Sequence, residues 1–268
     1  MTMKTISSCL SACLLIISSC STIMEDRGEC PCYLNVEVSS RYDLFEGPGN
    51  AWCSVYDNRN ALVAISEVVD VNSRDTTLTY VIAPRQPVSV IVTNTPVRSG
   101  SIVADRDSDF HDVWVTRRDA DCNTEETTIR IDELHKQFCE LTITLEKGTR
   151  NKIPITGVDV TADYNGIQVP SMRPNVGRFH YATDFDEGDR ATVCLPRQGG
   201  YGLTLIVKID GSTKDVPIDL YGIMASTDYA WDEDNLRDFQ IEISVDEFGI
   251  GAGVRGWVKT PGQDIHVD

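Results

Sequence analysis

Cysteine is the residue type whose number and spacing in this sequence most directly suggest chemistry. The chain has nine cysteines. Cys9 and Cys13 lie in an apolar stretch near the start, and Cys20 follows that stretch directly. The other six are Cys30, Cys32, Cys53, Cys122, Cys139 and Cys194. Thiols can be acylated, oxidised in pairs to disulfides or used as metal ligands, and the surrounding residues favour different chemistry for different members of this set.

Residues 1–19 are typical of a secretory signal peptide, with a positive charge at Lys4 and an apolar run over 10–17. The run is too short to cross a bilayer, which takes about 20 residues. Ile17-Ser18-Ser19-Cys20 resembles a bacterial lipobox. We therefore expect Cys20 to be the acylated N-terminus of the mature chain and residues 20–29 to be a lipidated spacer. The alternative is an ordinary signal peptide that leaves Cys20 as an unmodified thiol.

The six later cysteines are an even number in a chain predicted to be exported, which favours disulfide bonds. The sequence does not choose among the possible pairings. Cys30-Pro31-Cys32 is too tight to bridge itself, so each of these cysteines would need a distant partner. Zinc is the competing interpretation, but the histidines are scattered singly rather than in ligand pairs. We expect no metal and no cofactor.

Motifs for catalysis and phosphate binding are missing from the sequence. Ser99-Gly100-Ser101 is not a nucleophile elbow, and Gly199-Gly200-Tyr201-Gly202 lacks the Lys-Ser/Thr of a phosphate loop, so we expect a turn there. Asp184–Asp189 resembles a calcium loop, but Leu195 stands where the bidentate Glu is needed. Solvated acidic loops are the alternative for such an acidic chain. We predict that the protein is not an enzyme.

Two aromatic residues are candidates for ligand contact. Tyr229 and Trp231 lie in a polar stretch, where an exposed ring could stack on a sugar, whereas most other aromatic residues are expected in the core.

The charge balance excludes another class of partner. The chain has 24 Lys+Arg against 41 Asp+Glu, a net charge of −17, and no basic cluster. Such a surface repels phosphate backbones, so we expect no nucleic-acid partner.

Alternating apolar and polar residues are the dominant pattern and predict antiparallel strands. Leu34, Val36 and Val38 alternate with polar neighbours. The pattern returns at 53–56, 78–82, 88–92, 113–115, 141–145, 158–164, 203–209, 216–220 and 239–245. Asn165-Gly166 and Asp210-Gly211 predict tight hairpin turns, and 131–138 could form two helical turns.

These strands predict an all-β chain with two tandem antiparallel β-sandwiches. A sandwich of seven strands takes about 100 residues, which matches an N-terminal sandwich over 30–121 and a C-terminal one over 132–258. The polar stretch 122–131 would be the linker. The tail 259–268 contains alternating Ile265 and Val267, so it is either a donor strand or a frayed terminus.

Several segments together resemble a known family. The lipobox, the acidic spacer and Asp26–Pro31 leading into the strand at 34–38 look like the start of the FimB-like fimbrial anchor and accessory subunits of Bacteroidales, the lipoproteins of type V pili. Leu134–Ile143 resembles the start of that family's second domain, and Val254–Val258 resembles its closing strand.

This resemblance implies two transthyretin-like sandwiches, lipidation at the outer membrane, surface exposure and a place in a fimbria, without enzyme activity. It also implies that other fimbrial subunits join by strand exchange, in which a groove in one sandwich accepts a strand from the next. Pilins of the family open that groove when an arginine-specific protease removes an early strand. An anchor cleaved in this way would lose its lipid, which argues against cleavage here. A surface glycan- or protein-binding lipoprotein of a nutrient-uptake system is the alternative function.

Overall fold

The structure is a computed structural model that describes residues 30–38, 50–68, 75–97, 100–211, 216–245 and 250–254. The predicted signal peptide, Cys20 with its spacer, and the tail 259–268 lie outside these residues. In the described part of the chain, helices are too short or too polar to span a membrane.

Strands dominate the fold, as the alternating pattern predicted, and those of the N-terminal half form two sheets. A three-stranded sheet has the order β4 (Thr76–Ile82), β1 (Cys32–Val38), β8 (Glu126–Ile131). A five-stranded sheet has the order β3 (Leu62–Val68), β2 (Ala51–Tyr56), β5 (Pro87–Thr93), β7 (Trp114–Asp121), β9 (His135–Lys136).

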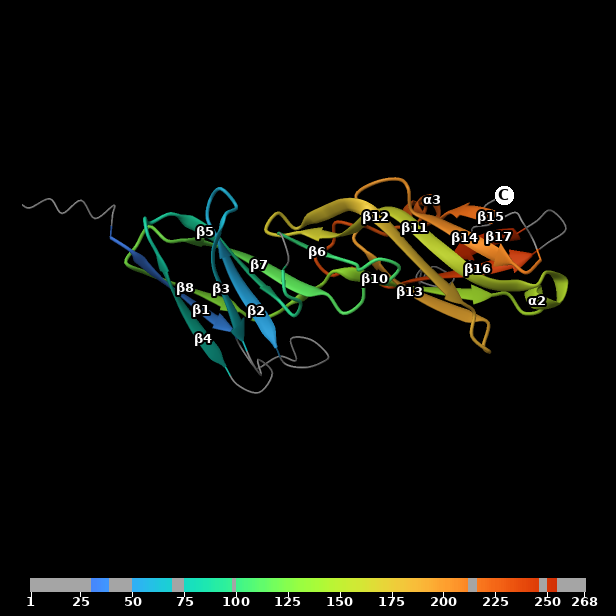
Figure 1. Ribbon diagram of the computed structural model, residues 1–268, viewed down its shortest axis with the longest axis horizontal. Helices are drawn as coiled ribbons and strands as arrows, with labels where there is room; N and C mark the ends of the chain where they lie inside the picture. The colour runs from blue at the N-terminus through green and yellow to red at the C-terminus, as the bar shows by residue number, and fades with distance from the viewer. Residues whose placement is uncertain are drawn as a thin grey trace, which may run out of the picture.

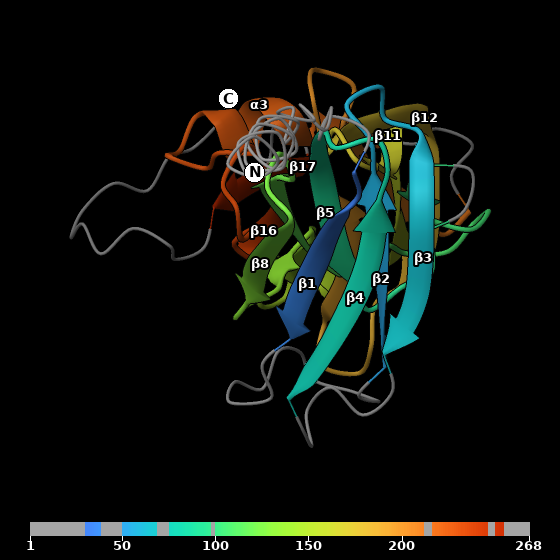
Figure 2. The ribbon, with the colours of Figure 1, turned by 90° about the vertical axis from the view of Figure 1, so that its left-hand side faces the viewer.

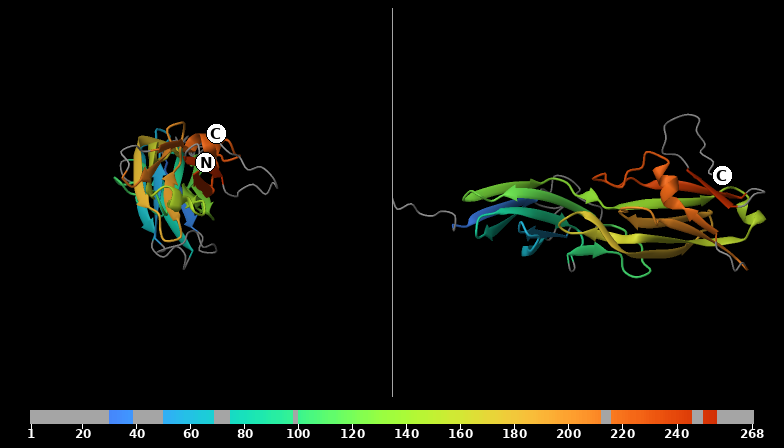
Figure 3. Two further views of the ribbon diagram at one scale, coloured as in Figure 1. Left: turned by 90° about the vertical axis from the view of Figure 1, so that its right-hand side faces the viewer. Right: turned by 90° about the horizontal axis from the view of Figure 1, so that it is seen from above.

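The C-terminal half also has two sheets. One has the order β13 (Arg190–Pro196), β10 (Phe138–Leu145), β16 (Phe239–Val245), β17 (Ile250–Val254). The other has the order β12 (Arg173–Asp184), β11 (Ile155–Gln168), β14 (Thr204–Ile209), β15 (Val216–Asp219), and β6 (Ser101–Val103) pairs with β11. Two short helices are described, α2 (Thr149–Lys152) and α3 (Leu220–Ala225). The halves lie end to end in an elongated molecule (Figures 1 and 3).

Each half has its own apolar core between its two sheets. The N-terminal cluster includes Leu34 and Val36 from β1 and Val90 and Val92 from β5, all fully buried. The C-terminal cluster is larger and also takes in side chains from the N-terminal half, among them Tyr56, Ile91 and Phe110. Packing therefore continues across the junction of the halves.

Residues 126–131 correct one expectation. The sequence predicted them to be part of a linker, but they form β8, which pairs in parallel with β1. Ile131 is buried and Ile129 packs against the N-terminal core. The alternate residues Glu126, Thr128 and Arg130 are exposed. The polar composition reflects a strand with one solvated face. The helix considered for 131–138 is also wrong, because this segment contains the end of β8, the short strand β9 and the first residue of β10.

One of the two predicted hairpin turns is also wrong. Asn165-Gly166 lies inside the long strand β11, at a shift in its register with β12. Gly166 pairs with Val103 of β6, and a Cβ on Gly166 would lie 2.1 Å from the carbonyl oxygen of Ile102. Glycine is needed here for the close approach of another strand. By contrast, Gly211 has φ +71° and lies between β14 and its antiparallel partner β15, so this hairpin is present as predicted. The last strand pair is Val207–Val216, so the connection is longer than the tight turn that was predicted.

Candidate functional site

Strand β1 is held by a paired strand on each side. It is the centre of its three-stranded sheet, antiparallel to β4 and parallel to β8 (Figure 2). Its register pairs all of Cys32–Val38 with β4 and Tyr33–Val38 with β8. Side chains alternate: Leu34 and Val36 are fully buried, whereas Tyr33 is 50% exposed. Removing β1 would leave main-chain donors and acceptors on both neighbours and open the N-terminal core.

Edge strands of the same half expose apolar side chains. Strand β3 is at the edge of the five-stranded sheet, and its Leu62, Val63 and Ile65 are 44–53% exposed. On the other sheet Tyr33 and Val81 face each other across the β1–β4 register, and both are at least half exposed. An exposed apolar edge is a template for pairing with another strand.

All six cysteines after the spacer are free thiols in the structure, so the predicted disulfides remain a prediction. Cys30 is exposed and the other five are buried. Burial raises the pKa of Cys53 to about 11 and the pKa values of Cys139 and Cys194 to about 12. Thiols this far from ionisation at neutral pH are poor nucleophiles.

Tyr229 and Trp231, predicted as ligand contacts, lie together but are partly buried. Their rings meet edge to face with centroids 4.9 Å apart, and Tyr229 also meets Phe239 at 5.5 Å. The Tyr229 hydroxyl donates to the carbonyl of Arg237 at 2.9 Å, and the Arg237 guanidinium lies over the Tyr229 ring. These contacts anchor the polar loop to the C-terminal core. Their role in ligand binding remains a prediction.

The loop around Trp231 is held by an arginine that the sequence analysis missed. Arg197 is only 7% exposed, and its guanidinium donates to Gln137 Oε1 at 3.0 Å and to the carbonyls of Trp231 and Glu233. Burial lowers the pKa of Arg197. No motif signals this residue, because its partners are mostly backbone carbonyls of a loop distant in sequence.

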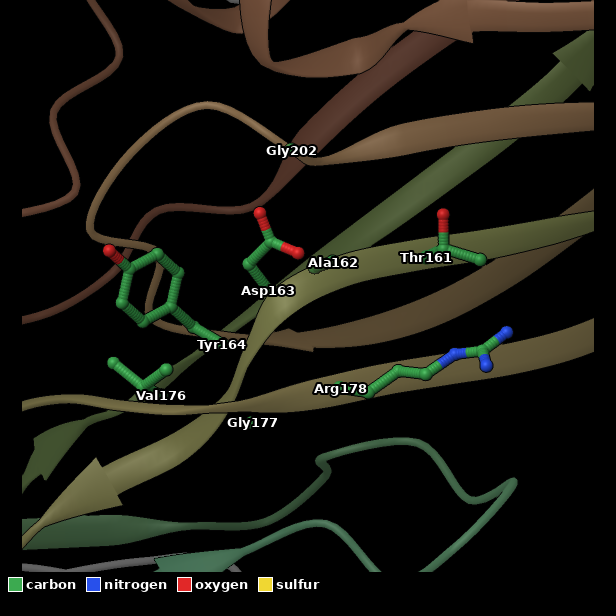
Figure 4. Close-up of a pocket in the computed structure, with 8 residues that line it drawn as sticks. All are labelled: Thr161, Ala162, Asp163, Tyr164, Val176, Gly177, Arg178 and Gly202. Atoms are coloured by element: carbon green, nitrogen blue, oxygen red, sulfur yellow. The ribbon is translucent and has the colours of Figure 1, made fainter.

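An open depression of about 660 Å³ lies over β11, β12 and the Gly202 turn. Asp163 points toward that turn, whereas Arg178 extends away from Tyr164 (Figure 4). Gly202 has φ +119°, and a Cβ there would lie 2.3 Å from Asp163 Oδ2, so this turn requires glycine. The neighbouring Tyr201 is 84% exposed, more than any other large apolar or aromatic residue that the structure describes.

The acidic loop 184–189 uses its carboxylates internally. Asp186 Oδ1 accepts from the backbone N–H groups of Gly188 and Arg190, both at 2.9 Å. Asp189 forms an ion pair with Arg150 at 2.7 Å. Within the described ranges, His, Cys, Asp and Glu form no group of three suited to a metal ion.

Comparison with known proteins identifies solved structures that share this fold. No family model matches the sequence, and a search of curated proteins also found no match. Among solved structures, the fimbrial anchor protein Mfa2 of Porphyromonas gingivalis superposes with a TM-score of 0.60 at 12% identity, over 89% of this chain and 100% of that one.

Two further structures have similar scores. A candidate adhesin of Bacteroides ovatus has a TM-score of 0.57 at 12% identity over 93% of this chain and 99% of its own. A candidate polysaccharide-binding protein of Bacteroides thetaiotaomicron has a TM-score of 0.57 at 11% identity over 87% and 100%. The chain therefore has the all-β sandwich fold of Bacteroidales fimbrial anchor and adhesin structures, which confirms at the level of fold the resemblance predicted from its sequence.

Proposed function

We propose that this protein is a non-enzymatic cell-surface lipoprotein that serves as an anchor or accessory subunit of a fimbria, a type V pilus. The observation that carries the proposal is a shared fold along the whole length of a fimbrial anchor protein. Cys20 would hold the mature chain in the outer membrane. The two halves would be tandem domains, with β8 counted in the first and the boundary after it rather than at residue 121.

Repeated topology supports the division into two domains. In each half the first strand lies between an antiparallel and a parallel neighbour: β1 between β4 and β8, and β10 between β13 and β16. Each half also has its own core cluster.

Strand exchange is the means by which neighbouring subunits would join. The exposed apolar edge at β3 supports this, because an incoming strand could pair there while β1 stays in place. Main-chain hydrogen bonds would supply the affinity, and alternate side chains of the incoming strand would pack beside the exposed side chains of β3.

The lipid anchor is tested by a single substitution. Cys20→Ala should release the protein, together with any fimbria it holds, from cells into the medium, because no acyl chain can then be attached. Cys30→Ala, which changes an exposed cysteine ten positions later, is the matched control and should stay with the membrane. Retention of the Cys20→Ala protein in the outer membrane would contradict lipid anchoring.

Subunit exchange is tested by mild solubilisation of the outer membrane of the native host, unboiled gel electrophoresis and mass spectrometry of each band. A ladder that collapses on heating and contains a second sandwich protein is expected. A lone monomer, or a complex with a porin-like transporter, would contradict the fimbrial proposal.

A glycan-binding role is the second candidate, favoured by the exposed Tyr201 beside the open depression and by the fold shared with a candidate polysaccharide-binding protein. On a sugar array, Tyr201→Ala and Trp231→Ala should each lose binding if these rings contact sugar. Val176 lines the same depression and is exposed but aliphatic, so the Val176→Ala protein should bind sugar normally. If the unaltered protein binds no sugar on the array, the glycan-binding role is ruled out.

A further inference from the structure

Two of the free thiols lie next to each other, although 89 residues separate them in the chain (122 − 32 − 1 = 89). Cys32 is the first residue of β1, in one sheet of the N-terminal half, and Cys122 directly follows β7, in the facing sheet. Both side chains are fully buried in the same core cluster. Folding therefore brings these two sulfur atoms together between the sheets.

The contacts around the two thiols show how close they are. Cys32 Sγ donates to Thr127 Oγ1 at 3.6 Å. Thr127 in turn donates to the carbonyl of Asp121, the residue before Cys122, at 3.0 Å. Both Cys32 and Thr127 lie close enough to Cys122 to shift its pKa, Cys32 upward and Thr127 downward. Two buried thiols on either side of one threonine are within reach of bonding after small side-chain rotations.

The other described cysteines lack such a partner. In the β10–β13 register Cys139 pairs with Leu195 and Cys194 pairs with Glu140, so the two thiols point to opposite faces of the sheet. The Cys53 thiol lies in the same core cluster, where the Tyr80 hydroxyl donates to the backbone carbonyl of Cys53 at 3.5 Å. Cys30 is exposed and only two residues before Cys32.

We propose that Cys32 and Cys122 form a disulfide in the exported protein, which ties β1 to the end of β7. An Sγ–Sγ bond forms and two S–H bonds break. The two protons and two electrons pass to a thiol–disulfide oxidant, whose own disulfide is reduced to two thiols. This pairing does not depend on the proposed fimbrial role.

Timing of this oxidation follows from the environment of Cys122. Burial, followed by the contact with Cys32, raises the pKa of Cys122 to about 12. Because both thiols are fully buried in the folded N-terminal half and the thiolate is the attacking species in disulfide exchange, we expect the bond to form while this half is still folding.

The disulfide would make β1 a strand that the protein cannot release. The exposed turn around Arg59 lies between the two cysteines, so a backbone cut there leaves β1 and the lipid end of the chain attached to β7 through sulfur. Strand β10, the corresponding strand of the other half, has no such bond, because Cys139 and Cys194 face opposite ways.

Peptide mapping tests the pairing. The full chain is exported with its own signal, alkylated with N-ethylmaleimide under denaturing conditions without reductant, digested and analysed by mass spectrometry. We expect a peptide pair joined through Cys32 and Cys122, with Cys53, Cys139 and Cys194 alkylated. Cys30→Ser should leave the link intact, and Cys32→Ser should leave Cys122 alkylated. Alkylation of both Cys32 and Cys122 in the unaltered protein, or a link from either one to another cysteine, would overturn the proposal.

A second measurement does not depend on how well the cysteine variants fold. A specific protease site is inserted after Asn58, in the exposed turn between β2 and β3, and the purified protein is cut. On a denaturing gel the cut chain should run as one band without reductant and as two bands with it. Reductant should also lower the melting temperature of the uncut protein by roughly 10 °C, because the bond closes a long loop. Two bands in the absence of reductant would overturn the proposal.

Discussion

The first strands of the two halves have the same neighbours but sit in cores of different size. Strand β1 and strand β10 each pair with an antiparallel strand on one side and a parallel strand on the other. Beyond the parallel partner of β10 lies a further strand, β17, whereas β8 is itself the edge of its sheet. Among described residues the N-terminal core cluster has 17 buried members, whereas the C-terminal cluster has 31, six of which come from the N-terminal half.

The side chains that fill the two cores also differ. The C-terminal cluster contains Phe179, Phe185 and Phe239, whereas the described members of the N-terminal cluster are Val, Ile, Leu, Ala and Cys residues together with Tyr80. Since hydrophobic stabilisation grows with the apolar area removed from water, the same topology is supported less strongly around β1. Burial therefore holds the N-terminal half less strongly than the C-terminal half, and the N-terminal half gains more from the proposed covalent tie.

The largest expected effect comes from a matched pair of core substitutions in these two strands. Leu34 and Leu141 are both fully buried, and Leu→Ala at either site should cost about 3 kcal/mol of unfolding free energy through lost burial and a cavity. Leu34→Ala should reduce amide exchange protection in β4 and β8 and leave β13 and β16 unchanged, whereas Leu141→Ala should do the reverse. If either variant lost amide exchange protection equally in both halves, the comparison would fail, because the halves would then unfold as one unit.

The next effect concerns the loop that Arg197 holds on the C-terminal half. Arg197→Ala removes the donors to Gln137 Oε1 and to the carbonyls of Trp231 and Glu233, and buried acceptors left unpaired should cost about 2 kcal/mol. Thermal unfolding measures this cost. Arg178→Ala, an exposed arginine, is the control and should change stability by less than about 0.5 kcal/mol. If the two variants behave alike, Arg197 does not hold the loop.

A smaller effect is expected where β6 of the N-terminal half of the sequence joins β11. Gly166→Ala places a methyl group against the backbone of Ile102 and Val103, and either the strands separate or β6 shifts, at about 1–2 kcal/mol. Hydrogen exchange at the amides of residues 101–103 and 166–168 reports the separation. Gly188→Ala is the control, since its new methyl group would lie 3.3 Å from a side-chain oxygen of Asp186 and would not press on the backbone of another strand. Unchanged exchange in Gly166→Ala would show that β6 pairing tolerates a side chain.

The smallest effect comes from a surface ion pair on β7 near the junction. Arg117 contacts Asp119 at 2.9 Å and donates to the carbonyl of Pro170 in the C-terminal half at 3.0 Å. The hydrogen bond from Ser89, together with the Arg117 guanidinium, holds the pKa of Asp119 below its ordinary value. Because the folded-state pKa is the lower one, this stabilisation is present above the unfolded pKa of about 4 and is lost as the pH falls through the folded value.

Asp119 is largely exposed, so Asp119→Asn should cost about 0.5 kcal/mol at pH 7 and less at pH 2. Urea unfolding at the two pH values measures the difference. An equal cost at both would show that the charge of Asp119 contributes nothing.

Strand positions were predictable because alternation is a local property of the sequence. Leu34, Val36 and Val38 all point into the core, as their spacing predicted. The same logic failed at 126–131, where the polar residues on the solvated face of β8 suggested a linker. A strand buried on one side at the edge of a sheet cannot be distinguished from a polar linker without knowing what it pairs with.

Asn165-Gly166 and Asp210-Gly211 look alike in the sequence, yet only Gly211 lies in a connection between paired strands. The difference depends on β6, which is far away in the chain and passes close to Gly166. Arg197 and the pair Cys32–Cys122 were likewise beyond local patterns, since their partners come from distant segments. By itself, the sequence determined the all-β class, the inward faces of the strands and the chemistry available to its cysteines. Tertiary structure alone decided which strands pair, which glycine must stay small and which two thiols meet, because these depend on contacts between residues far apart in the chain.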